Sequence, residues 1–267
     1  RPWRLQQQGL RYQQTQQFSK KSKTQRIQTS PQNNINIQEI ANWKKIIKNI
    51  HLPYSKDLNV FIQNDGFLNK DLQPIDNIKS DERPINQNWS WDKILRSPYI
   101  KQADVLQGFY FFENDFSKSE LESNFNYYEQ FTVHESSLSA CIHSILASRM
   151  NKIEKAYEYY IRASRLDLDD YNKEIKQGLH ITSMGGSWMS IIEGFAGVRI
   201  FKEKLYINTK IPKKWDSYSF KLNVKNRKIS VLINKHETKI ELLLGEKIDI
   251  VLNNQETTIY PKTIKIN

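Results

Sequence analysis

The spacing of apolar residues changes once along this 267-residue chain, near residue 197. Before that point, apolar side chains recur every three or four residues, which predicts amphipathic helices. Beyond it, apolar and polar residues alternate, which predicts strands. A block of helices followed by a block of strands favours an α + β multidomain fold over a mixed parallel sheet. We expect a helical part over residues 36–197 and a small antiparallel β-sheet domain over residues 198–267.

The helical part is predicted to consist of paired helices joined by loops of unequal length. Pro53 is expected to end the first helix, and Ser117 with Glu120 has the spacing of a capping box. Residues 54–98 carry turn residues and predict a long loop. A further helix is expected to start at Ser136 or Ser137. The other predicted helices cover residues 37–50 (with one buried stripe of Ile40, Trp43, Ile46, Ile47 and Ile50), 99–112, 117–128, 152–164 and 186–195.

The C-terminal part alternates apolar and polar residues over six segments. Asn226 is expected at the turn of a hairpin between two of them. The predicted strands cover residues 205–207, 218–224, 229–233, 238–244, 248–252 and 257–260.

The basic charge is concentrated at the start of the chain. The net charge is +11, yet residues 1–35 hold seven Lys or Arg and no Asp or Glu, which leaves +4 for the rest. Nucleic-acid binding is therefore the least favoured function for the body of the protein. Residues 1–35 are rich in Gln and Ser and predict a disordered, low-complexity basic tail; a frame-shifted or rearranged stretch is the alternative.

Two further classes are disfavoured by composition. Cys141 is the only cysteine, so no intramolecular disulfide can form, which fits a cytoplasmic protein. No apolar run reaches the roughly 18 residues of a membrane helix, and the first residues lack a signal-peptide core. The chain also lacks an initiator Met, and we expect it to be a fragment.

Four motifs carry polar residues that no folding argument demands. They lie at residues 83–96, 100–105 (with Lys101 and Gln102), 132–139 (His-Glu-Ser-Ser within it) and 178–184 (Leu-His-Ile-Thr-Ser within it). Hydroxyls and an imidazole beside helix N-termini suit an anion such as phosphate. An ammonium and an amide can bind sugar hydroxyls in defined directions.

Each motif also has a structural interpretation. One serine could simply cap a helix, the histidine at 180 could be packed in a loop, and Lys101 could be a solvated lysine. His143 is expected to be structural. Trp89, Trp91 and Trp188 could stack on sugars or pack in the core. Asp167, Asp169 and Asp170 could bind a metal, or pair with Arg165 and solvent. We expect no metal.

Together, these motifs resemble the disaccharide phosphorylases of glycoside hydrolase family 65, most closely the maltose phosphorylases. The resemblance covers about residues 42–224. It implies the closing helices of an (α/α)6 barrel followed by the β domain. It also implies inverting phosphorolysis of an α-glucosyl disaccharide: maltose and phosphate give β-glucose 1-phosphate and glucose. No cofactor is implied, because phosphate is a substrate. The parent enzyme is expected to be a cytoplasmic homodimer.

The resemblance also implies roles for individual residues. Ser136, Ser137 and His180 are expected to bind phosphate, and Lys101 and Gln102 the glucosyl ring. The remaining candidates are Glu135 and Thr182.

One catalytic group does not match. The general acid of the family is a glutamate upstream of these motifs, and residues 1–40 hold no residue that matches it. Phosphorylases for trehalose, kojibiose or nigerose remain alternatives, because acceptor-site loops lie mainly outside this chain. A truncated, inactive fragment is the other alternative, and it would expose apolar surface and aggregate.

Overall fold

The computed structural model describes residues 36–262 and 264–266. The predicted tail at residues 1–35 lies outside the described residues. The chain divides into two compact units, residues 1–53 and residues 54–267. Each unit is described by itself.

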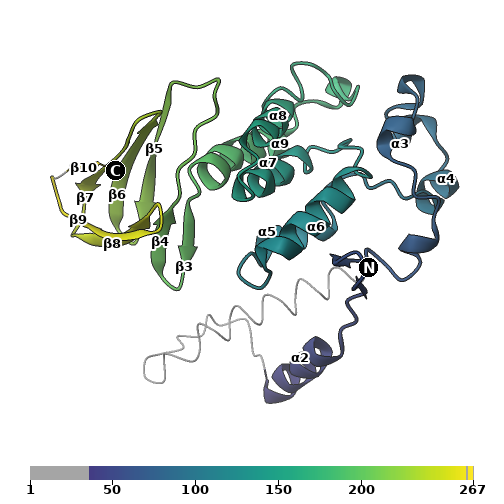
Figure 1. Cartoon of the computed structure of the whole chain (residues 1–267), viewed down its shortest axis with the longest axis horizontal. Coiled ribbons are helices and arrows are strands. Elements are labelled where there is room, and N and C mark those ends of the chain that lie inside the picture. The colour runs from purple at the N-terminus through teal and green to yellow at the C-terminus, as the bar shows by residue number, and fades with distance from the viewer. Residues whose placement is uncertain (1–35, 263, 267) are drawn as a thin grey trace. The chain divides into compact units, whose positions relative to one another are not determined.

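The first unit contributes one described helix, α2 (Ile37–Asn49) (Figure 1). Asn36 and Glu39 form a capping box: each side chain accepts a 2.9 Å hydrogen bond from the backbone N–H of the other. The helix ends at Asn49, four residues before Pro53, as predicted. The predicted burial is wrong, because no residue of α2 is buried. An apolar stripe predicts a helix, but its burial requires a partner surface.

Residues 54–98 form short elements where a loop was predicted. Turn residues divide this segment so often that no element exceeds six residues. Ser90 caps the last helix by accepting the N–H of Lys93 at 3.2 Å. The elements are β1 (Tyr54–Ser55), β2 (Val60–Phe61), η1 (Phe67–Asn69), η2 (Ile75–Asn77), η3 (Ser80–Glu82), α3 (Ile85–Asn88) and α4 (Trp91–Arg96).

Longer helices follow, and α7 lies at their centre. Residues 140–148 of α7 are all buried, as a helix surrounded by others must be. The predicted capping box of α6 is confirmed, with Glu120 N–H 3.1 Å from Ser117 Oγ. Helix α5 begins later than predicted, because residues 97–104 turn to meet residues 131–133. The helices are α5 (Val105–Phe111), α6 (Lys118–Glu129), α7 (Ala140–Arg149), α8 (Ile153–Ser164), α9 (Ile181–Met189) and the π-helix η5 (Ser190–Phe195).

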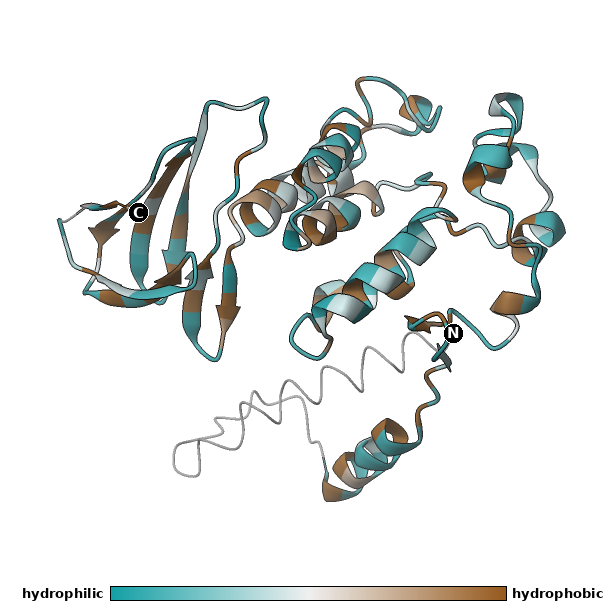
Figure 2. Ribbon diagram, viewed as in Figure 1, coloured by the Kyte–Doolittle hydropathy of each residue, from teal (hydrophilic) through white to brown (hydrophobic). Residues whose placement is uncertain are grey.

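The C-terminal part contains two four-stranded sheets, in the orders β10-β7-β6-β5 and β3-β4-β8-β9. Bands of apolar and polar residues alternate along β5 to β7 (Figure 2), and the apolar side chains of both sheets form one core. Asn226 lies in the hairpin turn between β5 and β6, as predicted, with φ of 62°. The strands are β3 (Arg199–Phe201), β4 (Lys204–Ile207), β5 (Ser217–Val224), β6 (Arg227–Asn234), β7 (Thr238–Leu244), β8 (Ile248–Leu252), β9 (Gln255–Ile259) and β10 (Ile264–Ile266).

One strand pair departs from the predicted antiparallel pattern: β4 and β8 are parallel. After β4 the chain leaves the β3-β4-β8-β9 sheet, forms the β5–β7 meander of the other sheet, and then returns as β8 beside β4. Parallel neighbours need such a long connection, and alternation alone does not reveal strand direction.

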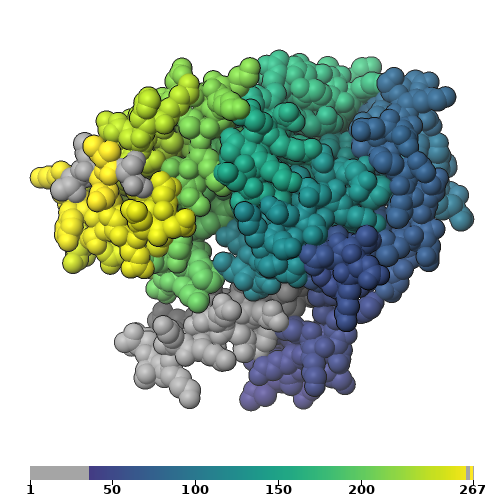
Figure 3. Space-filling model, in the orientation of Figure 1, coloured from purple at the N-terminus to yellow at the C-terminus, as the bar shows by residue number. Residues whose placement is uncertain are grey.

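The helical and β parts pack against each other within the second unit, as the space-filling view shows (Figure 3). A group of charged residues joins them. Glu113 accepts a hydrogen bond from Arg199 Nε at 2.8 Å and also pairs with Arg149. Burial lowers the pKa of Arg149 to about 10. Because a buried charge is costly without a partner, these pairs fix how α5, α7 and β3 meet.

Candidate functional site

Helices α5, α7 and α9 run in the same direction. The Cys141 side chain of α7 lies against Gly186 of α9, and Ser148 Oγ at the far end of α7 donates to the Gly194 carbonyl at 2.8 Å. Arg149 reaches the Phe109 carbonyl near the end of α5 at 3.1 Å. The N-termini of the three helices therefore lie at one end of the helical part. The loops that precede them carry the predicted site residues except Thr182, which lies in the first turn of α9.

The loops before α5 and α7 are held together by backbone hydrogen bonds. Ile100 N–H donates to the Phe131 carbonyl, and Val133 N–H to the Ile100 carbonyl, both at 2.9 Å. This pairing places Gln102 beside Ser136, whose hydroxyl donates to the Gln102 amide oxygen at 2.7 Å. Lys101 is exposed, and its ammonium group has no hydrogen-bond partner among the described residues. The structure thus brings together the predicted sugar-binding pair and one predicted phosphate ligand.

Neither serine of the pair caps a helix. Helix α7 begins at Ala140, later than predicted, because His134 has a left-handed φ of 55° and residues 136–139 form a turn. Ser136 Oγ accepts the N–H of Leu138, which precedes the helix, at 3.2 Å. Ser137 is partly buried and makes no hydrogen bond with the described residues. Simple capping therefore does not account for these hydroxyls.

The N-termini of α5, α7 and α9 also lack side-chain caps. Their N-cap residues are Asp104, Ser139 and His180, and none of these side chains accepts a hydrogen bond from the first turn. The Ser139 hydroxyl contacts His134 Nδ1 at 2.8 Å instead. First-turn N–H groups without a cap, together with the helix dipole, favour a bound anion.

His180 lies directly before α9, which begins earlier than predicted, at Ile181. Its ring Nδ1 is 2.5 Å from Asp167 Oδ1, and its backbone N–H donates to Asp167 Oδ2 at 2.8 Å. Its Nε2 lies 3.7 Å from Glu174 Oε2. The Thr182 side chain is exposed and makes no hydrogen bond with the described residues.

Glu135 is 3% exposed and lies between two loops. It accepts the Ile85 N–H at 2.8 Å and pairs with Arg83 Nε at 3.3 Å. The Arg83 guanidinium offsets the cost of burying this carboxylate. Both of its oxygens therefore bind groups of the protein, which makes Glu135 a link between the 83–88 segment and the loop before α7.

Asp169 and Asp170 of the acidic cluster each bind a different group of the protein. Asp169 forms two 2.7 Å hydrogen bonds with Arg165, which lower the pKa of Asp169. Asp170 accepts the backbone N–H of Glu174 at 2.8 Å. Within residues 36–262 and 264–266, no group of three His, Cys, Asp or Glu side chains could hold a metal ion. In the same ranges, no helix has the length and apolar character to cross a membrane.

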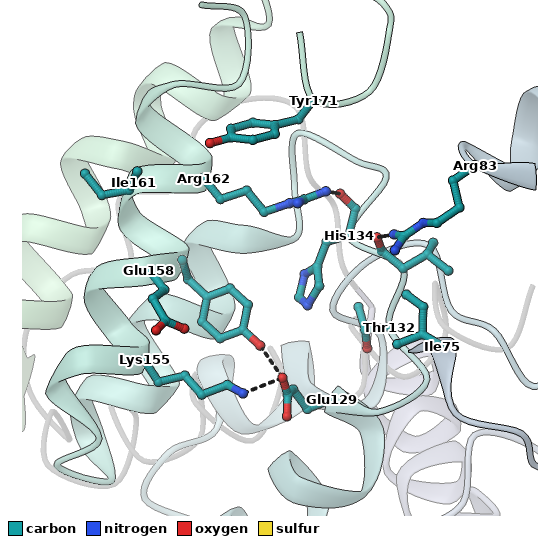
Figure 4. A pocket seen from close by; sticks show the side chains of 12 residues that line it. Ile75, Arg83, Glu129, Thr132, His134, Lys155, Glu158, Ile161, Arg162 and Tyr171 are labelled. Carbon is teal, nitrogen blue, oxygen red and sulfur yellow. Dashed lines mark hydrogen bonds and ion pairs between the residues drawn. The ribbon is translucent and has the colours of Figure 1, made fainter. Parts of the chain in front are cut away.

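A cavity of about 360 Å³ lies between the 129–134 segment and α8 (Figure 4). One charged pair lines it: Glu129 accepts from Lys155 at 2.6 Å and also from the Tyr159 hydroxyl at 2.9 Å. Burial raises the pKa of Tyr159. The cavity shares Thr132, Val133 and His134 with the loop before α7, but the predicted site residues lie outside its lining.

Two histidines beside this cavity were not predicted to act together. The rings of His134 and His143 are 4.5 Å apart, and burial lowers the pKa of both. The expected structural role of His143 fits its complete burial. No spacing rule indicates their contact, because His134 precedes α7 and His143 lies within it.

The three tryptophans singled out in the sequence differ in surroundings. Trp89 packs beside Tyr99, donates to Glu82 at 3.0 Å and has the Lys93 ammonium 3.5 Å from its ring centre. Trp89 is therefore structural. Trp91 and Trp188 are exposed.

Comparisons with known proteins agree with this organisation. Residues 10–189 match the glycosyl hydrolase family 65 central catalytic domain, and residues 198–259 match the C-terminal domain of that family. The first match begins upstream of residues 42–224, over which the sequence was expected to resemble the family.

Individual relatives act on different disaccharides. The chain is 48% identical to maltose phosphorylase of Bacillus subtilis over 83% of this chain and 30% of the relative. It is 39% identical to α,α-trehalose phosphorylase of Thermoanaerobacter brockii over 87% of this chain and 30% of the relative.

A solved structure gives the same result for the fold. It is of a protein assigned as a kojibiose phosphorylase from the human microbiome, and it has a TM-score of 0.80 and 35% identity over 87% of this chain and 31% of that one. The chain thus spans about 30% of the length of these relatives. With both its helical and its β part matched, the chain belongs to glycosyl hydrolase family 65.

Proposed function

We propose that this chain forms the C-terminal part of an inverting disaccharide phosphorylase that acts on maltose. Ser136, Ser137 and His180 bind inorganic phosphate, and Lys101 and Gln102 bind the glucosyl ring. The observation that carries the proposal is that the loops bearing these residues precede parallel helices whose N-termini have no side-chain cap.

The chemistry follows from what phosphate needs. An inverting glycosidase activates water with a carboxylate, whereas phosphate is already a nucleophile and is repelled by one. Hydroxyls and free backbone N–H groups are suitable partners for it. The Ser137 hydroxyl, which has no hydrogen-bond partner among the described residues, and the first turns of α7 and α9 provide such donors.

In the proposed reaction, a phosphate oxygen forms a bond to the anomeric carbon on the face opposite the leaving sugar. The glycosidic bond breaks, its electrons pass to the leaving oxygen, and a carboxylic acid protonates that oxygen. We place this acid outside residues 1–267. The products are β-glucose 1-phosphate and glucose, and no cofactor takes part. We further propose a cytoplasmic, homodimeric parent enzyme.

The substrate is proposed from similarity. The maltose phosphorylase is more similar to this chain than the trehalose or kojibiose phosphorylases, at 48% identity against 39% and 34%. Phosphorylases of trehalose, kojibiose or nigerose are the alternatives. Release of β-glucose 1-phosphate from each disaccharide, measured on the polypeptide encoded by this and the upstream sequence, separates them. Faster release from another disaccharide than from maltose would refute the assignment.

A catalytically inactive fragment is the second candidate. It is favoured by the exposed apolar side chains of α9, Ile181, Met184 and Trp188. The test compares the purified 267-residue chain with the extended polypeptide. Activity of the extended polypeptide alone places catalysis in the longer protein, and inactivity of both supports the fragment.

The phosphate site is tested by Ser137→Ala in the active polypeptide. We expect the KM for phosphate to rise at least about tenfold with little change in the KM for maltose, because a hydrogen bond to a charged group contributes about 1.5–3 kcal/mol and about 1.4 kcal/mol is a factor of ten. Ser119→Ala, on the exposed first turn of α6, is the control. Equal effects of the two substitutions would contradict the site.

A further inference from the structure

His180 is held by one carboxylate at two points. Asp167 accepts the ring Nδ1–H through one oxygen at 2.5 Å and the backbone N–H of His180 through the other at 2.8 Å. The two side chains are mostly buried, at 19% and 15% exposed. A carboxylate that binds both the ring and the backbone fixes the position of the ring and its rotation.

We propose that Asp167 is a positioning residue that fixes the tautomer of His180 and presents Nε2 to the phosphate. This inference rests on the proposed function, since it assigns a purpose to that same site. An ionised carboxylate only accepts hydrogen bonds, so the ring nitrogen that faces it must carry a proton. Nε2 is then the atom available to a ligand, whether the imidazole is neutral or charged.

The ionisation of Asp167 supports this arrangement. Burial acts to raise the pKa of Asp167, but the hydrogen bonds from His180 and its charge outweigh burial, and the net pKa lies below the ordinary value. Asp167 is therefore an anion at neutral pH, and it cannot donate a proton that would reverse the tautomer.

Nε2 forms no hydrogen bond with any residue that the structure describes. Glu174 Oε2 lies 3.7 Å away, which is longer than a hydrogen bond. Glu174 is held in place by Asp170, which accepts its backbone N–H at 2.8 Å. The 167–174 loop therefore sets one carboxylate on Nδ1 and leaves Nε2 without a bonded partner among the described residues.

The tautomer can be observed directly in the purified chain, whether or not that chain is an enzyme. The sequence has five histidines, so two-bond ¹H–¹⁵N correlation spectra of the ¹⁵N-labelled chain are simple, and His180→Gln identifies the signal. We expect a protonated Nδ1 at about pH 8. An unprotonated Nδ1 would overturn the proposal.

Asp167→Asn supplies the second test. An amide can donate as well as accept, so we expect the Nε2–H tautomer to gain population. Asp169→Asn is the matched control, because Asp169 lies in the same loop but pairs with Arg165. Asp167→Glu keeps a carboxylate and is expected to restore the protonated Nδ1. An Asp167→Asn spectrum identical to wild type would also overturn the proposal.

Inorganic phosphate added to the same samples separates this inference from the proposed function. Phosphate is expected to shift the Nε2 signal of His180, and Asp167→Asn to raise the apparent Kd for phosphate about tenfold, as loss of an orienting partner commonly does. A protonated Nδ1 with no response to phosphate would count against the phosphate site and leave the role of Asp167 in the tautomer intact. An unchanged Kd in Asp167→Asn would show that the positioning has no effect on phosphate.

Discussion

The contact between α7 and α9 gives the sharpest stability prediction. A methyl group at Gly186 would lie 2.6 Å from Cys141 Cβ and 2.7 Å from Cys141 Sγ. Carbon atoms in contact normally stay about 3.5–4.0 Å apart, so the helices would have to separate by roughly 1 Å at this point. Cys141 belongs to the fully buried part of α7 and has little freedom to move. Gly186→Ala is therefore expected to strain the core.

The loss of stability caused by Gly186→Ala is best measured relative to the variant Gly185→Ala. Both changes occur in α9 and affect the unfolded chain alike, so the gain of about 1 kcal/mol in helix propensity applies to both. A methyl group at Gly185 has no neighbour within 4 Å. The difference between the two variants is then the overpacking cost, about 1–3 kcal/mol.

Urea unfolding followed by tryptophan fluorescence is the appropriate assay, with the free energy of unfolding extrapolated to water. We expect Gly185→Ala to be as stable as wild type or more so, and Gly186→Ala to be about 1–3 kcal/mol less stable than Gly185→Ala. A difference below about 0.5 kcal/mol would show that α7 and α9 can separate freely, and would refute the reasoning. Because His180 directly precedes α9, Gly186→Ala should also weaken any phosphate response at His180.

Three other predictions concern the described residues. Glu113→Gln should lower the free energy of unfolding by about 2 kcal/mol, because two arginines lose a partly buried partner; this value lies between those for surface and buried ion pairs. The control is Asp92→Asn, which breaks an exposed pair and should change the free energy of unfolding by only about 0.3 kcal/mol in the same urea assay. His143 is buried and its pKa is lowered to about 4, so the unfolded state binds a proton more readily than the folded state does. The folded state is therefore destabilised as the pH falls below about 6.5, by up to about 1.4 kcal/mol per pH unit down to pH 4. His143→Asn should make the measured pH dependence shallower, and an unchanged slope would contradict this. The double substitution Met184→Lys and Trp188→Lys should reduce the binding of a hydrophobic dye and the self-association of the purified chain without lowering its stability. Unchanged self-association in light scattering would show that another apolar surface is responsible.

The candidate site was predictable as a set of residues but not as an arrangement. The hydroxyls, the imidazole and the Lys-Gln pair were identifiable in the sequence. Their position at one end of the helical part depends on the backbone pairing of Ile100 with residues 131–133 and on the parallel course of α7 and α9. Asp167 was considered only as part of an acidic cluster, because no spacing rule links it to His180, 13 residues later.

The predicted starts of two helices were wrong for the same reason. Residues 97–104 and 134–139 have helix-compatible composition, yet their backbone groups bond to each other or to neighbouring loops rather than along a helix axis. Local propensity cannot compete with such tertiary hydrogen bonds when the helix end is short.

Local chemistry along the sequence by itself determined the period change near residue 197, the capping boxes at Asn36 and Ser117, and the hairpin at Asn226. These depend on neighbouring residues only, so they can be read without the fold. The tertiary structure decided what depends on distant partners: the exposure of α2, the parallel pairing of β4 with β8, and the carboxylate that holds His180. Burial, strand direction and side-chain pairing each require two segments that are far apart in the chain, and their free energies are fixed only when the chain has folded.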